Sequence, residues 1–223
     1  MSRPSVLFIA TQFPFPARNG ITNKTAHYLA WLGRVADVTL VTFATPREPP
    51  TAEGREMARR HCVAVHTLAQ QPRRSAAAAA RLQAPFVTRF RTDSALALIR
   101  RLTAERTFDL VHLDCHGSIA LHDAISRAPG QLVASPNDAY GLMLAGLPTS
   151  SSIVARGAAV VNRMLVRRFE RDAFGACDQV HFVSRVDCDY LARLAPGVRT
   201  HWVPLGVAVP PASALDATAE VAA

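Results

Sequence analysis

The sequence predicts an α/β fold: a doubly wound, mostly parallel sheet of about seven strands with helices on both faces. Short apolar runs recur along the 223 residues, and several are nearly continuous in Val, Leu, Ile and Phe. Such runs are typical of parallel strands that are covered on both faces. Stretches with helical periodicity lie between most of these runs. The alternating order implies right-handed crossovers and a single layered domain.

Seven apolar runs fit strands, and they come in the chain order 6–10, 37–43, 63–69, 109–114, 131–135, 178–184 and 199–204. The first reads VLFIA and the second DVTLVTF. The third and the seventh have the weakest patterns. Seven strands separated by crossovers are enough for a large core in a chain of this length.

Helical periodicity fills most of the gaps between these runs. In 21–35, Ile21, Tyr28 and Leu32 repeat at three- and four-residue steps and form one apolar stripe with their neighbours. Asp93 is expected to accept hydrogen bonds from the first turn of the helix that follows it. Two more helices are predicted over 151–176 and from 186 to just before Pro196. Ser184 and Asp187 are expected to cap the last one.

The connection after the first strand, TQFPFPARNGITNK, is longer than an ordinary strand-to-helix loop of roughly two to six residues. Asn19 and Gly20 offer a position that is free to adopt a positive φ. The helix that begins at Ile21 would point its free amides back at this loop, which favours a phosphate or another anion. Lys24 lies one turn into that helix. The alternative is an irregular surface crossover with a solvated Lys24.

Polar residues follow the fourth and fifth predicted strands, at the edge where open α/β sheets bind ligands. Asp114 and His116 follow the fourth strand, and Asn137 and Asp138 follow the fifth. Together they could hold a hydroxyl-rich ligand. His116 fits a functional role and a packing role equally well, whereas His112, inside a strand, is expected to be a core histidine.

The net charge of +8 is concentrated between Arg55 and Arg106, where eleven arginines face three acidic residues. Such a surface favours an anionic partner, either a phosphate-bearing substrate, a nucleic acid or membrane lipid. Within it, Leu82, Phe86, Val87 and Phe90 are interleaved with arginines, and we predict contact of this surface with an anionic membrane through Arg73–Arg106. No nucleic acid is expected, because no recognised motif is present. The alternative is a set of solvated helices in an arginine-rich chain.

Several function classes are excluded by missing patterns. The chain lacks G-x-G-x-x-G after the first strand, the P-loop motif and G-x-S-x-G, which argues against dinucleotide dehydrogenases, P-loop NTPases and α/β hydrolases. Its four scattered cysteines read as small buried hydrophobes, so no metal site is expected. No secretion signal or membrane-spanning run is found, which predicts a cytoplasmic protein with at most peripheral contact at the inner face of the membrane.

Four stretches resemble the N-terminal domain of family 4 glycosyltransferases of the GT-B fold, closest to the group associated with exopolysaccharide synthesis. They read VLFIATQFPFPARNGITNKTAHYLAWLGRVADVTLVTF, APFVTRFRTDSALALIRRLTAERTFDLVHLD, RRFERDAFGACDQVHFVSRVDCDYL and VPLGV. Together they cover most of residues 5–207. Each motif is loose, but their order and spacing match the family. The family usually has a Gly pair where Asn19-Gly20 stands, Arg where Lys24 stands and Asn where Leu205 stands.

The resemblance implies a metal-independent transfer of a sugar from a nucleotide sugar to a lipid-linked or polysaccharide acceptor. It implies that Asn19, Gly20 and Lys24 approach the donor phosphates. It also implies that Asp114, Asn137 and Asp138 line the acceptor side together with His116, our candidate catalytic residue. The chain itself is expected to bind no cofactor, and the nucleotide sugar is a co-substrate of the complete enzyme.

The resemblance also sets the expected domain organisation. Residues 1–205 correspond to the acceptor-side, Rossmann-like domain and 206–223 to a linker or frayed tail, whereas the donor-binding domain is absent. The chain alone is therefore expected to be inactive until a partner domain or subunit supplies the other half of the cleft. The alternative is a non-catalytic binding or scaffold module, or a fragment, that pairs with a partner.

Overall fold

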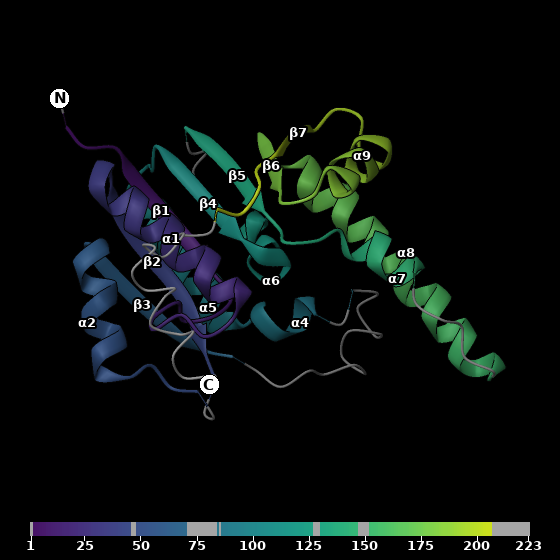
Figure 1. Ribbon diagram of the computed structural model, residues 1–223, viewed down its shortest axis with the longest axis horizontal. Coiled ribbons are helices and arrows are strands. Elements are labelled where there is room, and N and C mark those ends of the chain that lie inside the picture. Colours follow the sequence, from purple (N-terminus) through teal and green to yellow (C-terminus); the bar gives the residue numbers. More distant parts are fainter. Residues whose placement is uncertain are drawn as a thin grey trace, which may run out of the picture.

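A computed structural model describes residues 2–45, 48–70, 84, 86–126, 130–146 and 152–206. Seven parallel strands form one sheet in the order β3-β2-β1-β4-β5-β6-β7, with helices on both of its faces (Figure 1). The strands are β1 (Ser5–Ala10), β2 (Asp37–Ala44), β3 (Ala64–Ala69), β4 (Leu110–Asp114), β5 (Gln131–Ser135), β6 (Gln179–Phe182) and β7 (Arg199–Trp202). The fold class predicted from the sequence is confirmed, and each predicted run overlaps one of these strands.

The sheet is doubly wound, because the chain moves outward from β1 in both directions. The helices are α1 (Gly20–Val35), α2 (Ala52–His61), α4 (Val87–Phe90), α5 (Asp93–Glu105), α6 (Cys115–Ile119), α7 (Tyr140–Ala145), α8 (Ile153–Gly175), α9 (Arg185–Leu194) and the short 3-10 turn η1 (His122–Ala124). The strand order reverses between β1 and β4. A ligand is therefore expected outside the carboxyl ends of these two strands.

Alternate residues of the strands divide the core between the two faces. Phe8 on β1 packs with Leu29 of α1 and Ala58 of α2 on one face. On the other face, Ile9 belongs to a larger cluster that includes side chains from α5, α8 and α9. Because side chains alternate along a strand, His112 and Asp114 on β4 share the α1 face, whereas Val111 and Leu113 face the other way.

The helix ends depart from the predicted caps. Thr92, and not Asp93, caps α5, because its Oγ1 accepts from the amide of Ala95 at 3.1 Å. Asp93 is the first residue of the helix, where its charge favours the helix dipole. Ser184 stands at the start of α9 but its side chain makes no capping bond. The carboxylate of Asp187 accepts instead from the amide of Ala139, 3.0 Å away, and so ties α9 to the turn after β5.

The described part of the arginine-rich segment 55–106 contains less exposed apolar surface than its sequence suggests. Phe86, Val87 and Phe90, which the sequence analysis places on a membrane-contacting surface, are buried in this part of the chain. They cannot lie against lipid while they pack inside the domain. Arg73, Arg74 and Arg81 lie outside the described residues, as do positions 207–223 of the predicted tail.

Cys62, Cys115 and Cys177 are buried, as the sequence predicts, whereas Cys188 is only half-buried. Burial raises the pKa of the Cys62 and Cys177 thiols to about 12. Among the described helices, none is both long enough and apolar enough to cross a membrane.

Candidate functional site

A cleft of about 450 Å³ opens at the carboxyl edge of the sheet, next to the switch point between β1 and β4. Its walls come from the segments after β1, β2, β3, β4 and β5, from the region of α4 and from the start of α1. Polar residues on these walls are Thr11, Gln12, Asn19, Thr22, Thr45, Thr51 and Gln70. The aromatic residues are Phe13, Phe15, Phe43, Phe86, Phe90 and Tyr140.

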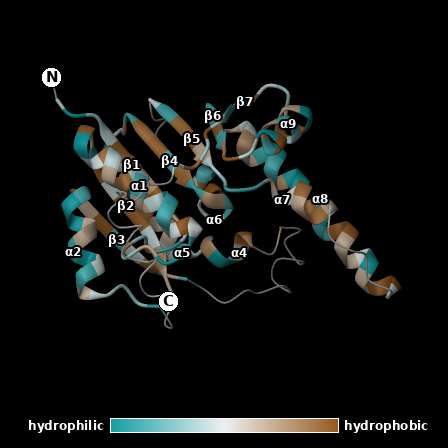
Figure 2. Cartoon of the chain, in the orientation of Figure 1, coloured by the Kyte–Doolittle hydropathy of each residue, from teal (hydrophilic) through white to brown (hydrophobic). Residues whose placement is uncertain are grey.

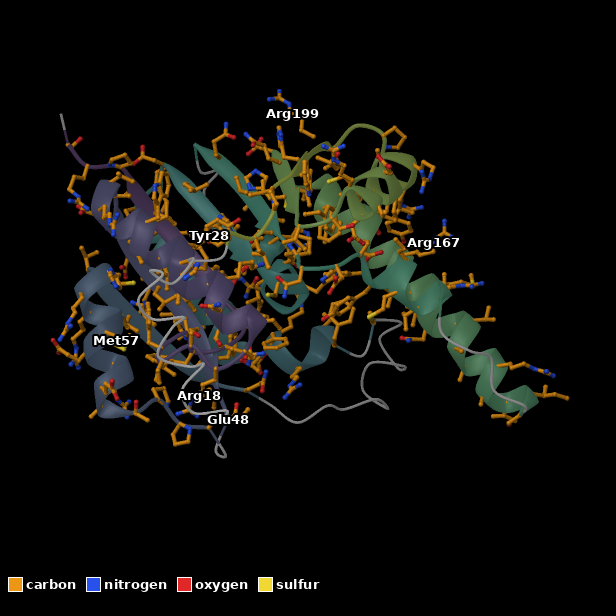
Figure 3. The ribbon with its side chains drawn as sticks, viewed as in Figure 1. Arg18, Tyr28, Glu48, Met57, Arg167 and Arg199 are labelled. Carbon is orange, nitrogen blue, oxygen red and sulfur yellow. The ribbon has the colours of Figure 1, made fainter. Side chains whose placement is uncertain are left out.

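Three charged side chains complete the cleft: Arg18, Glu48 and Arg89. Arg18 and Glu48 lie at the same end of the molecule (Figure 3). Arg89 donates to the side-chain oxygen of Gln70 at 2.8 Å, which holds the guanidinium in the cleft wall. Aromatic faces beside several fixed donors and acceptors suit a ligand that combines an apolar ring face with many hydroxyl groups.

The loop after β1 forms one wall of the cleft and ends in a capping box. The Asn19 side chain accepts from the amide of Thr22 at 3.0 Å, and the Thr22 hydroxyl accepts from the amide of Asn19 at 3.0 Å. The Asn19 amide group also donates to Gln12, across the loop. Gly20 is the first residue of α1 and adopts no positive φ, so the expected reason for a glycine there is wrong.

Helix α2 supports this loop through a close approach at Gly54. A Cβ built on Gly54 would lie 2.2 Å from the carbonyl oxygen of Phe15. This is far inside van der Waals contact, and the obstacle is backbone rather than a flexible side chain. The absence of a side chain at position 54 therefore sets how closely α2 and the β1 loop pack.

Gly54→Ala should lower the free energy of unfolding by about 1 to 3 kcal/mol, because the added methyl must push the β1 loop away from α2. Urea denaturation followed by circular dichroism measures the change. Gly157→Ala, in α8, is the matched control, since its Cβ would meet nothing within 4 Å. The control should be neutral or stabilise the protein by up to about 1 kcal/mol. Equal stability of Gly54→Ala and the wild type would contradict the close packing.

Lys24 and Asp114 form a buried ion pair beneath the cleft. The Lys24 ammonium lies 2.7 Å from Asp114 Oδ1 and donates to the backbone oxygen of Ser135 at 2.8 Å. Asp114 also accepts from the hydroxyls of Ser135, at 3.0 Å, and Thr25. The pair joins α1, β4 and β5. Burial opposes the charge of Lys24, but the Asp114 carboxylate raises the pKa of Lys24 above its usual value.

The sequence predicts different ligands for Lys24 and Asp114, whereas in the structure the two side chains form an ion pair with each other. The resemblance places Lys24 near donor phosphates and Asp114 on the acceptor side. Both side chains are almost completely buried, and their charges are paired. This arrangement supports a positioning role, in which the pair holds the base of α1 against β4 and β5.

His112 extends this network across the sheet. Its Nε2 lies 2.7 Å from the Ser135 hydroxyl. That hydroxyl donates its only proton to Asp114, so it accepts from Nε2–H of His112. The ring stacks on Phe8 with centroids 4.6 Å apart. The core role predicted for His112 is confirmed.

The chain turns sharply at the end of β4, and Cys115 takes a φ of 70°. This left-handed conformation is uncommon for a residue with a side chain and costs energy, as is often seen at ligand sites. The turn brings Gly117 into the wall of the cleft, where a Cβ would lie 2.3 Å from the ring of Phe90. Burial raises the pKa of the Cys115 thiol to about 12, so the thiol remains protonated.

His116, the candidate catalytic residue, is buried one layer behind the cleft wall. Its ring stacks flat on Tyr140, with centroids 3.8 Å apart. Its Nε2 lies 3.1 Å from Glu170, a fully buried carboxylate that also accepts from Tyr190 OH and the amide of Gly141. Tyr140 and Phe86 lie between His116 and the cleft. Its catalytic role stays a prediction.

The turn after β5 contributes Tyr140 to the cleft rather than the two residues predicted from the sequence. Asp138 is exposed, and Asn137 is half-buried. Among the described residues, the side-chain oxygen of Asn137 has no hydrogen-bond partner. An acceptor-binding role for either residue stays a prediction.

Sequence reasoning did not select Arg18, Glu48, Arg89 or Tyr140 as site residues. Arg18 directly precedes the predicted Asn19-Gly20 pair, and Tyr140 follows Asp138 by two residues, so their positions after β1 and β5 were available signals. Glu48 lies in a segment for which the sequence predicts no site, and Arg89 lies in the segment for which the sequence predicts membrane contact instead. Only the folding of the chain brings them to the edge formed by β1 and β4.

No protein family model matches the chain, and no curated protein matches it either. Solved structures do match. HepE of Anabaena, in complex with UDP-glucose, is similar over 98% of this chain and 50% of its own, at 14% identity and a TM-score of 0.55. A UDP-glucosyltransferase from Polygonum tinctorium is similar over 96% of this chain and 56% of its own, at 13% identity and a TM-score of 0.51.

The chain therefore spans about half the length of the solved structures that it matches. These neighbours are glycosyltransferases of the GT-B fold, which is built from two Rossmann-like halves. At such low identity the likeness establishes the fold alone: this chain has the fold of one half of a GT-B protein.

Proposed function

We propose that this chain is the acceptor-side half of a glycosyltransferase that moves a sugar from a nucleotide sugar to a lipid-linked or polysaccharide acceptor. The cleft at the carboxyl edge carries the proposal, because it combines aromatic faces, polar side chains and two arginines next to the switch point of a GT-B half. The neighbours' complexes with UDP-glucose are consistent with a sugar nucleotide as the donor.

The start of α1 is the element that we place nearest to the donor phosphates. The Asn19 side chain accepts from the amide of Thr22, and Asn19, Ile21 and Thr22 all line the cleft, so the first turn of α1 borders it. Helix N-termini bind anions through their free amides and the helix dipole. Arg18 lies beside this turn and adds positive charge. The chemistry needs no metal, and the chain needs no cofactor of its own.

The acceptor is assigned to the opposite, aromatic wall. A sugar ring can stack on Tyr140 or Phe86 while Gln70 and Thr45 reach its hydroxyls. In this assignment, His116 and Glu170 support Tyr140 on the side away from the cleft. The Asp114–Lys24 ion pair positions the segments beneath the cleft. Asn137 and Asp138 remain available at the rim for a longer acceptor.

Transfer requires a second half. Groups on only one side of the reacting bond cannot stabilise its transition state, so a donor-binding domain or subunit is the proposed partner. The motifs quoted above favour family 4 and exopolysaccharide synthesis in the cytoplasm. The runner-up function is a non-catalytic binding module, which the match to half of each neighbour also permits.

The test has two arms. In the first, oligosaccharides and UDP-glucose are titrated into the isotope-labelled chain, and amide shifts are followed by NMR. Saccharides should shift the signals of cleft residues, and Arg18→Gln should weaken the binding of phosphate-bearing sugars about tenfold to a hundredfold, as loss of a charged hydrogen bond does. Arg34→Gln, an exposed arginine at the other end of α1, is the matched control.

In the second arm, transfer from UDP-glucose and other nucleotide sugars is measured with and without a co-expressed donor-binding domain. Activity should appear only with both halves present. Saccharide binding in the cleft without transfer in any pairing would favour the binding module. Shifts confined to residues outside the cleft would overturn the proposed site.

A further inference from the structure

Helix α8 extends well beyond the elements that it packs on. From Ile153 to Val161 every residue is exposed, and the first buried residue of the helix is Val166 (Figure 1). We call residues 153–164 the free half of α8. It is about 18 Å long. A helical segment with no packed face needs another explanation for its apolar residues, since they gain nothing from exposure to water.

The free half is strongly apolar, as Figure 2 shows by its brown segments. Ile153, Val160 and Met164 recur at steps of seven and four residues and so lie on one stripe, with exposed fractions of 76%, 48% and 65%. Val154 and Val161 extend this stripe and are 82% and 53% exposed. The residues that pack on the domain, Val166 and Ala173, lie on the opposite side of the helix.

Arginines border this stripe in register with it. Arg156, Arg163 and Arg167 each follow one of the apolar residues Ile153, Val160 and Met164 by three positions. Residues three apart are neighbours on a helix surface, so a row of guanidinium groups runs alongside the apolar row. Arg167 stands where α8 meets the domain, because its side chain interacts with Tyr190 of α9, so Arg156 and Arg163 are the arginines of the free half itself. The sequence holds no acidic residue between Ile153 and Phe169, and Glu170 is buried.

We propose that the free half of α8 lies in the surface of an anionic membrane. An exposed apolar stripe beside a row of arginines is the arrangement of helices that rest at the level of the lipid headgroups. The apolar side chains would enter the acyl boundary, while the arginines extend their stems and keep their charges at the phosphates. A second copy of this chain is a poorer occupant, because it would bring two arginine rows together.

This surface differs from the one that the sequence predicts. Phe86, Val87 and Phe90 of the Arg73–Arg106 window are buried, and contact through the rest of that window stays a prediction. The free half of α8 also projects at the carboxyl edge of the sheet, the edge that carries the cleft (Figure 1). If the proposed function holds, membrane contact would therefore bring the cleft to acceptors carried on lipid. The membrane contact itself does not depend on that function.

The experiment is flotation of the full chain with vesicles of phosphatidylcholine alone or with added phosphatidylglycerol. The chain should float with the anionic vesicles, and binding should weaken as salt is raised. The triple variant Ile153→Ser, Val160→Ser, Met164→Ser should lower the partition coefficient at least about tenfold. Its fold should be kept, because the changed side chains are exposed. Unchanged circular dichroism and urea midpoint verify this.

Three variants distinguish the alternatives. Val35→Ser, Val63→Ser and Val186→Ser, combined in one chain, remove exposed valines elsewhere and should leave flotation unchanged. Arg156→Gln with Arg163→Gln should weaken binding and flatten its dependence on salt. Arg73→Gln, Arg74→Gln and Arg81→Gln, changed together, test the window favoured by the sequence and should have the smaller effect.

The proposal is overturned if the chain does not float with anionic vesicles, or if the serine triple floats as well as the wild type. It is equally overturned if only the Arg73, Arg74 and Arg81 change abolishes binding. Sedimentation velocity adds a further check: a dimer that the serine triple converts to a monomer would make a second copy the occupant.

Discussion

Lys24→Met should lower the free energy of unfolding by about 3 to 5 kcal/mol, the largest loss that we expect from any single substitution of a charged side chain in this protein. The change leaves the Asp114 carboxylate buried without its positive partner. It also removes the donor to the backbone oxygen of Ser135. An uncompensated charge costs far more in a buried site than at the surface, because water cannot solvate it.

Two further variants distinguish the loss of the buried positive charge of Lys24 from the loss of a long side chain. Arg34→Met removes an exposed cation from the same helix and should change stability by less than about 0.5 kcal/mol. The double variant Lys24→Met, Asp114→Asn removes both charges and should be less destabilised than the sum of the two single variants. Urea denaturation measures all four. Additive effects would show that the two charges do not stabilise each other.

Stability should fall by about 3 kcal/mol between pH 6.5 and pH 4 because of His112 alone. The pKa of His112 is lowered to about 4, chiefly by burial; Asp114 opposes this shift, and the nearby Lys24 and His181 favour it. In the unfolded chain the ring has its usual pKa of about 6.5. Between these values the unfolded state binds the proton more tightly than the folded state. The contribution of His112 to the free energy of unfolding is therefore fully present above about pH 6.5, and it is lost as the pH falls toward 4.

The measurement compares urea denaturation at several pH values for the wild type and His112→Gln. The variant should be less stable at neutral pH, because it loses the stacking on Phe8, but its stability should change less on acidification. His27→Gln removes an exposed histidine from α1 and should keep the slope of the wild type. If the free energy of unfolding of His112→Gln fell with pH as steeply as that of the wild type, His112 would not be the source of the pH dependence.

Local pattern was enough to predict the strands. Apolar runs such as 6–10 and 37–43 have to be covered on both faces, and the intervening helices leave a parallel sheet as the consistent arrangement. The edge at which a ligand should lie follows from that topology. The cap of α5 was misplaced by one residue, because Thr92 and Asp93 are both good capping residues and their order alone does not distinguish them.

The site was predicted less completely, because its side chains come from separate segments. The sequence indicates the β1 loop and the polar residues after β4 and β5, which lie where expected along the chain. It gives no sign that Lys24 reaches Asp114, ninety residues away, or that Tyr140 covers His116. Nor does it show that Phe86 and Phe90 turn inward from an arginine-rich segment.

The sequence by itself determined the strands, their direction and the edge that carries the cleft, because hydrophobic periodicity and crossover handedness are properties of short segments. The tertiary structure alone decided which charges are paired, which arginines face the cleft and which apolar residues stay in water. These outcomes depend on distances between segments far apart in the chain. A charged residue looks the same in the sequence whether it forms a buried ion pair or stays at the surface. Only the folded structure distinguishes these two environments.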